Sequence, residues 1–197
     1  MPDAAAYSAI VLAGGGSSRL GRDKTQVQVA GHSALDRVLA ALDGAAQIVV
    51  VGVPRRLHPA RGVLWTQEQP PGGGPAAGVA AAAKMLREPW VVVLAGDLPM
   101  VDAETVRRLL AGAAGADDGA VLVDAGGRRQ HLSVALRTEA LRQRLAGRSW
   151  HGAPMWRLLD ELTLAEVAAR GHETLDLDDA AAVATAQRLI SDTKDTS

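Results

Sequence analysis

The chain of 197 residues contains no cysteine and no phenylalanine, and aromatic residues make up only 3% of it. The absence of cysteine excludes disulfides, thiolate nucleophiles, and zinc or iron–sulfur sites that depend on sulfur ligands. With so few aromatic rings, the core must consist mainly of Ala, Val and Leu. Lysine is also scarce, because only three of the 21 basic residues are Lys, at positions 24, 84 and 194. A lysine inside a motif is therefore informative.

Neither sign of charge dominates the sequence. The 21 basic and 22 acidic residues leave a formal net charge of −1, which argues against a general nucleic-acid-binding surface. No apolar run approaches the roughly 18 residues of a membrane-spanning helix. The first residues have no basic flank before their short apolar run, so we expect no signal peptide. We expect a cytoplasmic protein without a nucleic-acid or membrane partner.

Short β-branched runs alternate with Ala- and Leu-rich stretches, which is typical of a mainly parallel sheet flanked by helices. With 48% hydrophobic residues the chain has enough apolar side chains for a core. We expect one Rossmann-like α/β domain over residues 1–190 and a flexible polar tail over 191–197. The expected strands are Tyr7–Ala13, Ile48–Val53, Val63–Thr66, Trp90–Ala95, Ala120–Val123 and His131–Leu136. The expected helices are Ser33–Leu42, Pro75–Arg87, Ala103–Ala111, Thr138–Leu145, Pro154–Leu162 and Asp179–Ile190.

A glycine-rich stretch, LAGGGSSRLGRDK, follows the first expected strand and occupies residues 12–24. Glycines allow successive backbone N–H groups to converge on phosphate oxygens, and Arg19 and Lys24 add the fixed positive charge that a polyphosphate needs. The stretch is not a dinucleotide fingerprint, because Arg19 stands where the third glycine is required. It is not a P-loop either, because Lys24 and Thr25 come two positions late. The alternative is an ordinary turn in a protein rich in glycine and alanine.

These residues resemble the LAGG-x-S-x-R-M-G-x-D-K signature of nucleotidyltransferases related to molybdenum cofactor guanylyltransferase, with Leu20 in place of Met. The resemblance implies a nucleotide-diphospho-sugar-transferase-type fold. It also implies transfer of a nucleoside monophosphate from a nucleoside triphosphate, with release of pyrophosphate. The residues that it implies for nucleotide binding are Leu12, Ala13 and Gly14 for base and ribose, Gly15 and Arg19 for phosphates, and Lys24 for the nucleotide.

A carboxylate, Asp97, comes just after the apolar strand in the sequence Leu-Ala-Gly-Asp-Leu-Pro-Met. In open α/β sheets ligands bind outside the carboxyl ends of the strands, and Mg²⁺ commonly binds one or two carboxylates together with substrate phosphates. Asp97 can alternatively cap the next helix, although Asp102 is better placed as that cap. The segment also resembles the metal-carrying Asp-x-Pro motif of the family. We expect Asp97 to bind Mg²⁺ and to act in catalysis with Arg19 and Lys24.

A second acidic pair, Asp176 and Asp178, precedes the last expected helix and resembles the family's late Asn-x-Asn-Thr-Pro or Asp-x-Asp-Thr-Pro element. On an extended segment both side chains point to one face, so Asp178, Asp176 or both can ligate the metal. The alternative is that Asp178 or Asp179 caps the helix. Family members that transfer guanylyl groups tend to carry Asn here, whereas Asp is common in cytidylyl-transferring relatives. The sequence therefore leaves open whether the nucleobase of the substrate is guanine or cytosine.

The loop over residues 67–78 resembles the family loop that ends in Gly-Pro-Leu-Ala-Gly, and it places Glu68 and Gly78 at the nucleotide. A carboxylate at Glu68 can accept hydrogen bonds from the N1–H and the exocyclic amine of guanine. The alternative is a flexible surface turn.

Signals for the acceptor are weaker. Arg128 and Arg129 resemble part of the family's Arg-Asp-His-Pro segment and can hold a phosphorylated acceptor, or they can be a solvated hairpin turn. His131 has no neighbour in the sequence that indicates a general base. Trp150 and Trp156 can stack on a flat pterin or can be packing anchors.

Together, these features predict an Mg²⁺-dependent nucleotidyltransferase that joins GMP from GTP to molybdopterin, with contact to molybdoenzyme maturation proteins as a further possibility. The alternatives within this class are a CTP-dependent molybdopterin cytidylyltransferase and an enzyme that uses a sugar phosphate. An alternative of a different class is a nucleotide-binding module without catalytic activity.

Overall fold

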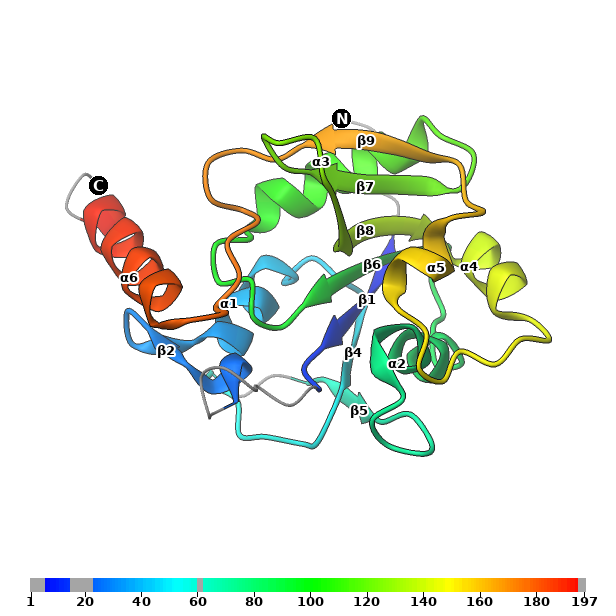
Figure 1. The fold of residues 1–197 in the computed structure, drawn as a ribbon, viewed down its shortest axis with the longest axis horizontal. Helices are drawn as coiled ribbons and strands as arrows, with labels where there is room; N and C mark the ends of the chain where they lie inside the picture. The colour runs from blue at the N-terminus through cyan, green and yellow to red at the C-terminus, as the bar shows by residue number, and fades with distance from the viewer. Residues whose placement is uncertain (1–5, 15–22, 60–61, 195–197) are drawn as a thin grey trace.

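The computed structural model describes residues 6–14, 23–59 and 62–194. A seven-stranded sheet with the strand order β5-β4-β1-β6-β8-β7-β9 forms its centre (Figure 1). The strands of this sheet are β1 (Tyr7–Leu12), β4 (Gln47–Val51), β5 (Leu64–Thr66), β6 (Trp90–Ala95), β7 (Gly119–Val123), β8 (Arg129–Arg137) and β9 (Leu164–Ala168). All neighbouring strands are parallel except that β8 is antiparallel to both β6 and β7. The expected α/β fold with a mainly parallel sheet is confirmed.

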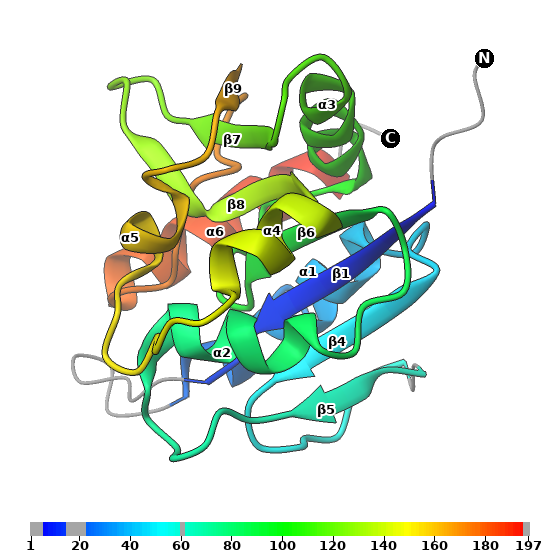
Figure 2. The ribbon, with the colours of Figure 1, turned by 90° about the vertical axis from the view of Figure 1, so that its right-hand side faces the viewer.

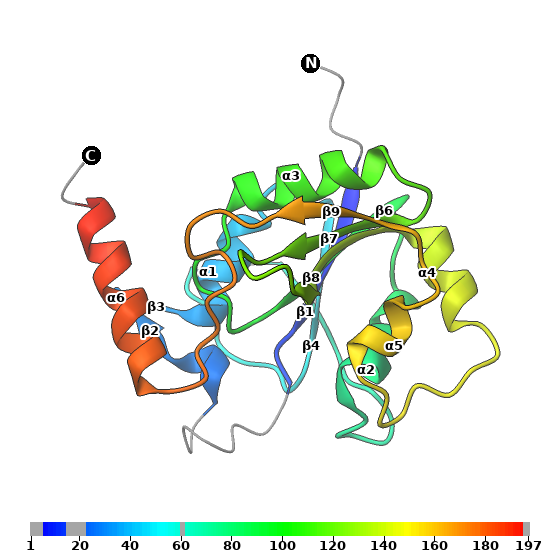
Figure 3. The same ribbon diagram turned by 45° about the horizontal axis from the view of Figure 1, so that its top comes forward.

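Helices cover both faces of the sheet (Figure 3). One face packs against α1 and α3, and the other against α2, α4 and α5. The central strands β1 and β6 are buried on both faces. For β6, the apolar run without polar alternation over residues 91–94 predicts this burial. The α-helices are α1 (Ala34–Ala41), α2 (Gly74–Ala83), α3 (Ala103–Ala114), α4 (Thr138–Leu145), α5 (Met155–Leu159) and α6 (Ala180–Lys194).

The last helix, α6, lies beside the sheet rather than on it and packs on a small hairpin made of β2 (Gln28–Val29) and β3 (His32–Ser33) (Figure 1). A separate apolar cluster joins the two, with Val29 from the hairpin, Leu177 from the preceding segment and Val183 from α6. The helix continues to Lys194 and so enters the segment expected to be a tail.

Three short strands were not expected from the sequence: β2, β3 and β9. Strand β9 has the sequence LAEVA and contains a single β-branched residue, so it carries little strand signal of its own. It forms because its backbone pairs with β7 at the edge of the sheet, where only one neighbour is required (Figure 2).

The parallel pairing of β4, β1 and β6 brings the carboxyl ends of these three strands together. The N–H of Ala13 donates to the carbonyl oxygen of Val51 at 2.8 Å, and the N–H of Gly96 donates to that of Leu12 at 2.9 Å. The segments that follow these strands therefore leave the same edge of the sheet side by side. No helix in the described ranges is long and apolar enough to cross a membrane.

Candidate active site

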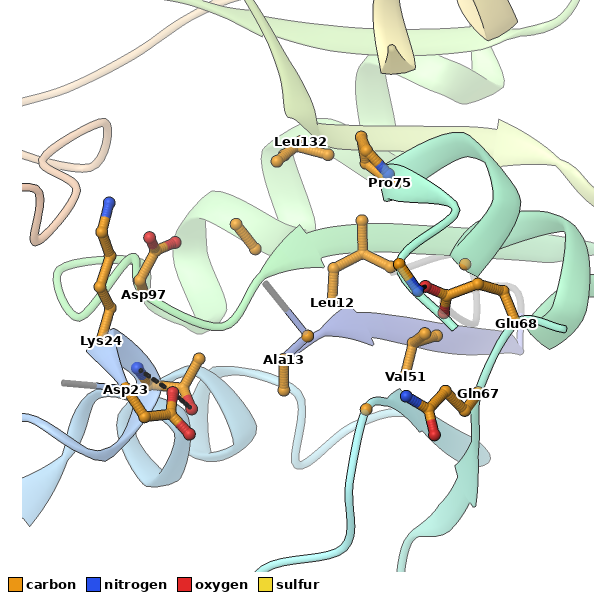
Figure 4. Close-up of a pocket in the computed structure, with 17 residues that line it drawn as sticks. Leu12, Ala13, Asp23, Lys24, Val51, Gln67, Glu68, Pro75, Asp97 and Leu132 are labelled. Atoms are coloured by element: carbon orange, nitrogen blue, oxygen red, sulfur yellow. Dashed lines mark hydrogen bonds between the residues drawn. The ribbon is translucent and has the colours of Figure 1, made fainter. Parts of the chain in front are cut away.

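A cleft of about 510 Å³ opens at this edge of the sheet. Lys24 and Asp97 lie at one end of it and Glu68 at the other, with the end of β1 between them (Figure 4). The residues that the sequence singled out and that the structure places on its wall are Leu12, Ala13, Gly14, Lys24, Glu68, Gly78 and Asp97. Gly15 and Arg19 lie outside the described residues.

The wall beside β1 depends on the close approach of α2. A Cβ atom on Gly78 would lie 3.0 Å from Val51 Cγ1 and 3.3 Å from Leu12 Cδ2, so a larger residue there would press on both strands. The helix begins at Gly74, with Pro75 in its first turn, where the missing N–H of proline has no cost. The strand ends and the first turn of α2 thus form one continuous surface of the cleft.

Lys24 starts a short 3₁₀ turn, Lys24–Gln26, that Asp23 caps. Asp23 Oδ1 accepts hydrogen bonds from the backbone N–H of Thr25 at 3.1 Å and from its hydroxyl at 2.7 Å. The other oxygen, Oδ2, accepts from Arg55 Nε at 2.7 Å. Sequence reasoning missed Asp23 and Arg55. The position next to Lys24 in the Asp-Lys pair is a signal for Asp23, whereas no motif indicates Arg55.

Lys24 faces a group of carboxylates that come from two distant segments. Its Nζ donates to Asp178, and the charges of Asp97 and Asp176 also act on it. Burial lowers the pKa of Lys24, but the hydrogen bond with Asp178 and the three negative charges outweigh that effect, so its pKa is raised above the ordinary value. The structure therefore brings together Lys24, the aspartate after β6 and the pair before α6.

Two carboxylates of this group, Asp97 and Asp176, have pKa values above the ordinary value of aspartate. Burial raises the pKa of Asp97, the charge of Lys24 works against this increase, and the charge of Asp176 adds to it. Partial desolvation also raises the pKa of Asp176, followed by the charge of Asp178. Such an arrangement favours a bound cation, which would relieve the repulsion between the carboxylates. Within the described ranges, no three or more His, Asp or Glu side chains form a complete metal site.

The caps of α3 and α6 are Asp102 and Asp179, and Asp179 is one of the two residues expected as the cap of the last helix. Asp102 caps α3, and its Oδ1 accepts from the N–H of Thr105 at 2.8 Å in a capping box. Asp179 Oδ1 accepts from the N–H of Ala182 at 2.8 Å, in the first turn of α6. These contacts leave Asp97 and Asp178 facing Lys24 rather than capping a helix.

Glu68 organises the loop that leads to α2. Its Oε1 accepts hydrogen bonds from the N–H groups of Gly72 at 3.0 Å and Gly73 at 3.2 Å. These bonds fix the carboxylate at the rim of the cleft. The segment over residues 70–73 is therefore a tethered turn and not a linker.

The two candidate tryptophans have different environments. Trp150 is 6% exposed, its ring lies under the guanidinium of Arg144 at 4.9 Å, and it is a packing anchor. Trp156 is 53% exposed and lines a second cleft of about 290 Å³ together with Arg129 and His131. Burial and then the charge of Arg129 lower the pKa of His131.

The arginines of the β7–β8 connection pair with carboxylates of the chain itself. Arg128 Nε donates to Asp124 at 3.1 Å within the hairpin turn, and Arg129 Nε donates to Glu166 on β9 at 2.9 Å. The hairpin interpretation thus accounts for Arg128, whereas Arg129 is the first residue of β8 and pairs with the neighbouring part of the sheet.

The chain matches the family model of the MobA-like NTP transferase domain over residues 9–167. Two curated relatives are a probable molybdenum cofactor guanylyltransferase from Opitutus terrae and a molybdenum cofactor guanylyltransferase from Pseudomonas putida. The first is 36% identical over 106 residues, which cover 51% of this chain and only about half, 52%, of the relative. The second is 37% identical over 134 residues, covering 64% of this chain and 69% of the relative.

Solved structures share the fold at lower identity. A nucleotidyl transferase from Methanothermobacter thermautotroptrophicus superimposes with a TM-score of 0.74 at 20% identity, covering 95% of this chain and 99% of the other. The molybdopterin-guanine dinucleotide biosynthesis protein A from Archaeoglobus fulgidus gives a TM-score of 0.70 at 20% identity, covering 94% and 99%. These structures support the nucleotidyltransferase-type arrangement of the sheet.

Proposed function

The chain belongs to the MobA-like NTP transferase domain family, and from this premise we propose that it transfers GMP from GTP to the phosphate of molybdopterin and releases pyrophosphate. The names of the curated relatives support the guanylyl group and the acceptor. The observation that carries the proposal is that Lys24, which pairs with Asp178, and Asp97 lie at one end of a cleft that has Glu68 at its other end.

The cleft has the chemistry to hold a nucleoside triphosphate. The backbone of Ala13 and Gly14 lines its floor, where glycine and alanine let a ribose approach the chain closely. Lys24 supplies a positive charge for phosphate oxygens at the far end. Glu68, tethered by the N–H groups of Gly72 and Gly73, faces the cleft with an oxygen that can accept hydrogen bonds from guanine.

The carboxylates fit a divalent cation that binds together with the substrate. Mg²⁺ prefers oxygen ligands and typically uses one or two carboxylates plus substrate phosphates. Asp97 and Asp178, with Asp176 beside them, are such donors. The raised pKa values of Asp97 and Asp176 and the ion pair of Asp178 with Lys24 support the binding of positive charge there. When bound, Mg²⁺ supplies neutralisation of the charge on the α-phosphate and the departing pyrophosphate.

The acceptor phosphate is itself the nucleophile. One of its oxygens forms a bond to the α-phosphorus of GTP. The bond between that phosphorus and the oxygen that bridges the α- and β-phosphates breaks, and pyrophosphate leaves with the electron pair. Because the acceptor oxygen is already anionic, this step needs no strong general base. The contribution of Lys24 is therefore to position the triphosphate and to balance its charge.

The proposal is tested by incubating the purified protein with molybdopterin, Mg²⁺ and each of GTP, CTP, ATP and UTP, and by measuring pyrophosphate release. We expect release with GTP well above that with the other nucleotides. Release without a preference for GTP would refute guanylyl specificity, and nucleotide binding without any release would indicate a binding module instead.

A CTP-dependent reaction is the second candidate, and one observation favours it. Both residues at the late acidic pair are Asp, at positions 176 and 178, and this is the form that is common in cytidylyl-transferring relatives. A preference for CTP over GTP in the same assay would replace the first candidate by this one.

A further inference from the structure

The segment that carries Asp176 and Asp178 has almost no regular structure of its own. It occupies residues 169–179 and runs from β9, at one edge of the sheet, to the separate helix α6 (Figure 1). Two backbone hydrogen bonds form within it, from the N–H of Glu173 to Arg170 at 3.2 Å and from that of Leu175 to His172 at 2.9 Å. Something else must therefore fix where its carboxylates lie.

The side chain of Glu173 provides that attachment. Glu173 is 7% exposed, although glutamate is among the residues least often buried. Its Oε1 accepts from the hydroxyl of Thr105 at 2.8 Å and from Arg108, both on α3. Its Oε2 accepts from the backbone N–H of Arg170 at 2.8 Å, inside the segment itself. Both carboxylate oxygens are thus satisfied.

Arg108 joins this carboxylate to the end of the sheet. Its Nη1 donates to the carbonyl oxygen of Ala168, the last residue of β9, at 2.7 Å, while Nη2 donates to Glu173. The side chains of Arg108 and Glu173 are 12% and 9% exposed, so this ion pair is shielded from water and is screened by salt less than a surface pair. One planar guanidinium therefore holds both the strand end and the turn that follows it.

We propose that Glu173, held by Arg108, is a positioning residue that sets the place of Asp176 and Asp178 in the cation site. This inference rests on the proposed function. Glu173 anchors the segment before the acidic pair, the fully buried Leu177 lies between the two aspartates, and the cap residue Asp179 follows them. Without the charge of Glu173, the first anchor opens and the distance from Asp176 and Asp178 to Lys24 is no longer maintained.

The test compares Glu173→Gln with Glu161→Gln in the full-length protein. Both variants remove one ion-paired carboxylate and keep the size of the side chain, but Glu161 is exposed, pairs with Arg148 and Arg144, and does not line the cleft. Two measurements are made: the affinity for Mn²⁺ in the presence of GTP, from the electron paramagnetic resonance signal of free Mn²⁺, and hydrogen–deuterium exchange of the 174–178 amides. Arg108→Lys is the second variant, because it keeps the charge but loses the planar fork.

We expect Glu173→Gln to bind Mn²⁺ about tenfold more weakly, as is common for residues that orient metal ligands, and to exchange faster at 174–178. Arg108→Lys should weaken Mn²⁺ binding and speed exchange at 174–178 to a smaller extent, and Glu161→Gln should match the wild type in both measurements. A lower melting temperature with unchanged Mn²⁺ affinity or unchanged exchange at 174–178 would overturn the inference. If Asp178→Asn and Asp97→Asn also leave Mn²⁺ binding unchanged, the proposed function itself fails; if they abolish it, only the role of Glu173 is refuted.

Discussion

Arg55 Nε donates a hydrogen bond to Asp23 Oδ2 over 2.7 Å, and this contact attaches the β4–β5 connection to the residue immediately before Lys24. Arg55 also donates from Nη1 to the carbonyl oxygen of Val53 at 2.9 Å, so its guanidinium is held in place at both ends. Asp23 in turn caps the 3₁₀ turn that begins at Lys24. The guanidinium of Arg55, outside the cleft, thus sets the position of Lys24 inside it.

Replacing Arg55 should therefore weaken nucleotide binding. We expect Arg55→Gln to raise the KM for GTP several-fold and to lower the free energy of unfolding by about 1–2 kcal/mol, because a charge-assisted hydrogen bond is lost. The adjacent Arg56 is exposed and provides the matched control, Arg56→Gln, which should change neither quantity. Steady-state kinetics and chemical denaturation measure both. Equal effects of the two variants on KM would show that only the overall charge matters.

Asp97 should be a residue that the protein keeps at a cost in stability. Burial raises its pKa, so at neutral pH its ionised form disfavours the folded state, and Asp97→Asn removes that penalty. We expect Asp97→Asn to abolish metal-dependent pyrophosphate release while raising the free energy of unfolding on the order of 1 kcal/mol. The stability difference should shrink as the pH falls through the raised pKa of Asp97 and vanish below the ordinary pKa of aspartate, where the residue is protonated in both the folded and the unfolded state. A variant that is both inactive and less stable would indicate a structural role instead.

Metal binding should weaken on acidification earlier than the ordinary pKa of aspartate implies. The pKa values of Asp97 and Asp176 are both raised above 3.8, so protons compete with a divalent cation at a higher pH than at a free carboxylate. The affinity for Mn²⁺ in the presence of GTP, measured over a pH series, should fall as the pH drops through the raised pKa values of Asp97 and Asp176. In Asp176→Asn the remaining loss should shift to lower pH, because one negative neighbour of Asp97 is gone. An unchanged profile would contradict the coupling of the two groups.

Glu68 should discriminate between purine bases. In GTP its carboxylate can accept from both N1–H and the exocyclic amine, whereas inosine triphosphate lacks that amine. We expect Glu68→Gln to lower kcat/KM for GTP about 10- to 100-fold, and to reduce the preference for GTP over inosine triphosphate. If activity with both nucleotides falls by the same factor, the role of Glu68 is confined to holding the N–H groups of Gly72 and Gly73.

The two tryptophans should separate stability from acceptor binding. Trp150 is buried against Arg144, so Trp150→Ala should cost about 3–5 kcal/mol of unfolding free energy. Trp156 is 53% exposed, and Trp156→Ala should change stability by no more than about 0.5 kcal/mol. If its ring stacks on the pterin of the acceptor, the same variant raises the KM for molybdopterin and leaves that for GTP unchanged. No change in either KM would exclude that contact.

Much of this architecture is visible in local patterns. The uninterrupted apolar runs in β4 and β6 predict strands that are covered on both faces, and in a parallel sheet the loops after the strands must leave from one edge. Lys24 belongs to the segment after β1, Glu68 follows β5 and Asp97 follows β6, and all three line one cleft. Asp102 and Asp179 show their capping roles by their place before a helix.

The contacts that hold the candidate site residues in place have no such local signal in the sequence. Arg55 and Asp23 are 32 positions apart, and Arg108 and Glu173 are 65 apart, so nothing in either neighbourhood identifies the partner. Strand β9 likewise depends on β7 for its hydrogen bonds and has little strand propensity of its own.

By itself, the amino-acid sequence determined which segments become buried strands and which short motifs carry the groups that we propose for phosphate, metal and base, because side-chain periodicity and backbone freedom are local properties. Only the tertiary structure decided that Asp178 reaches Lys24 and that Arg55 and Glu173 hold the two sides of the site. Contacts between distant segments depend on how the strands are ordered and how the helices pack, and these are properties of the whole chain.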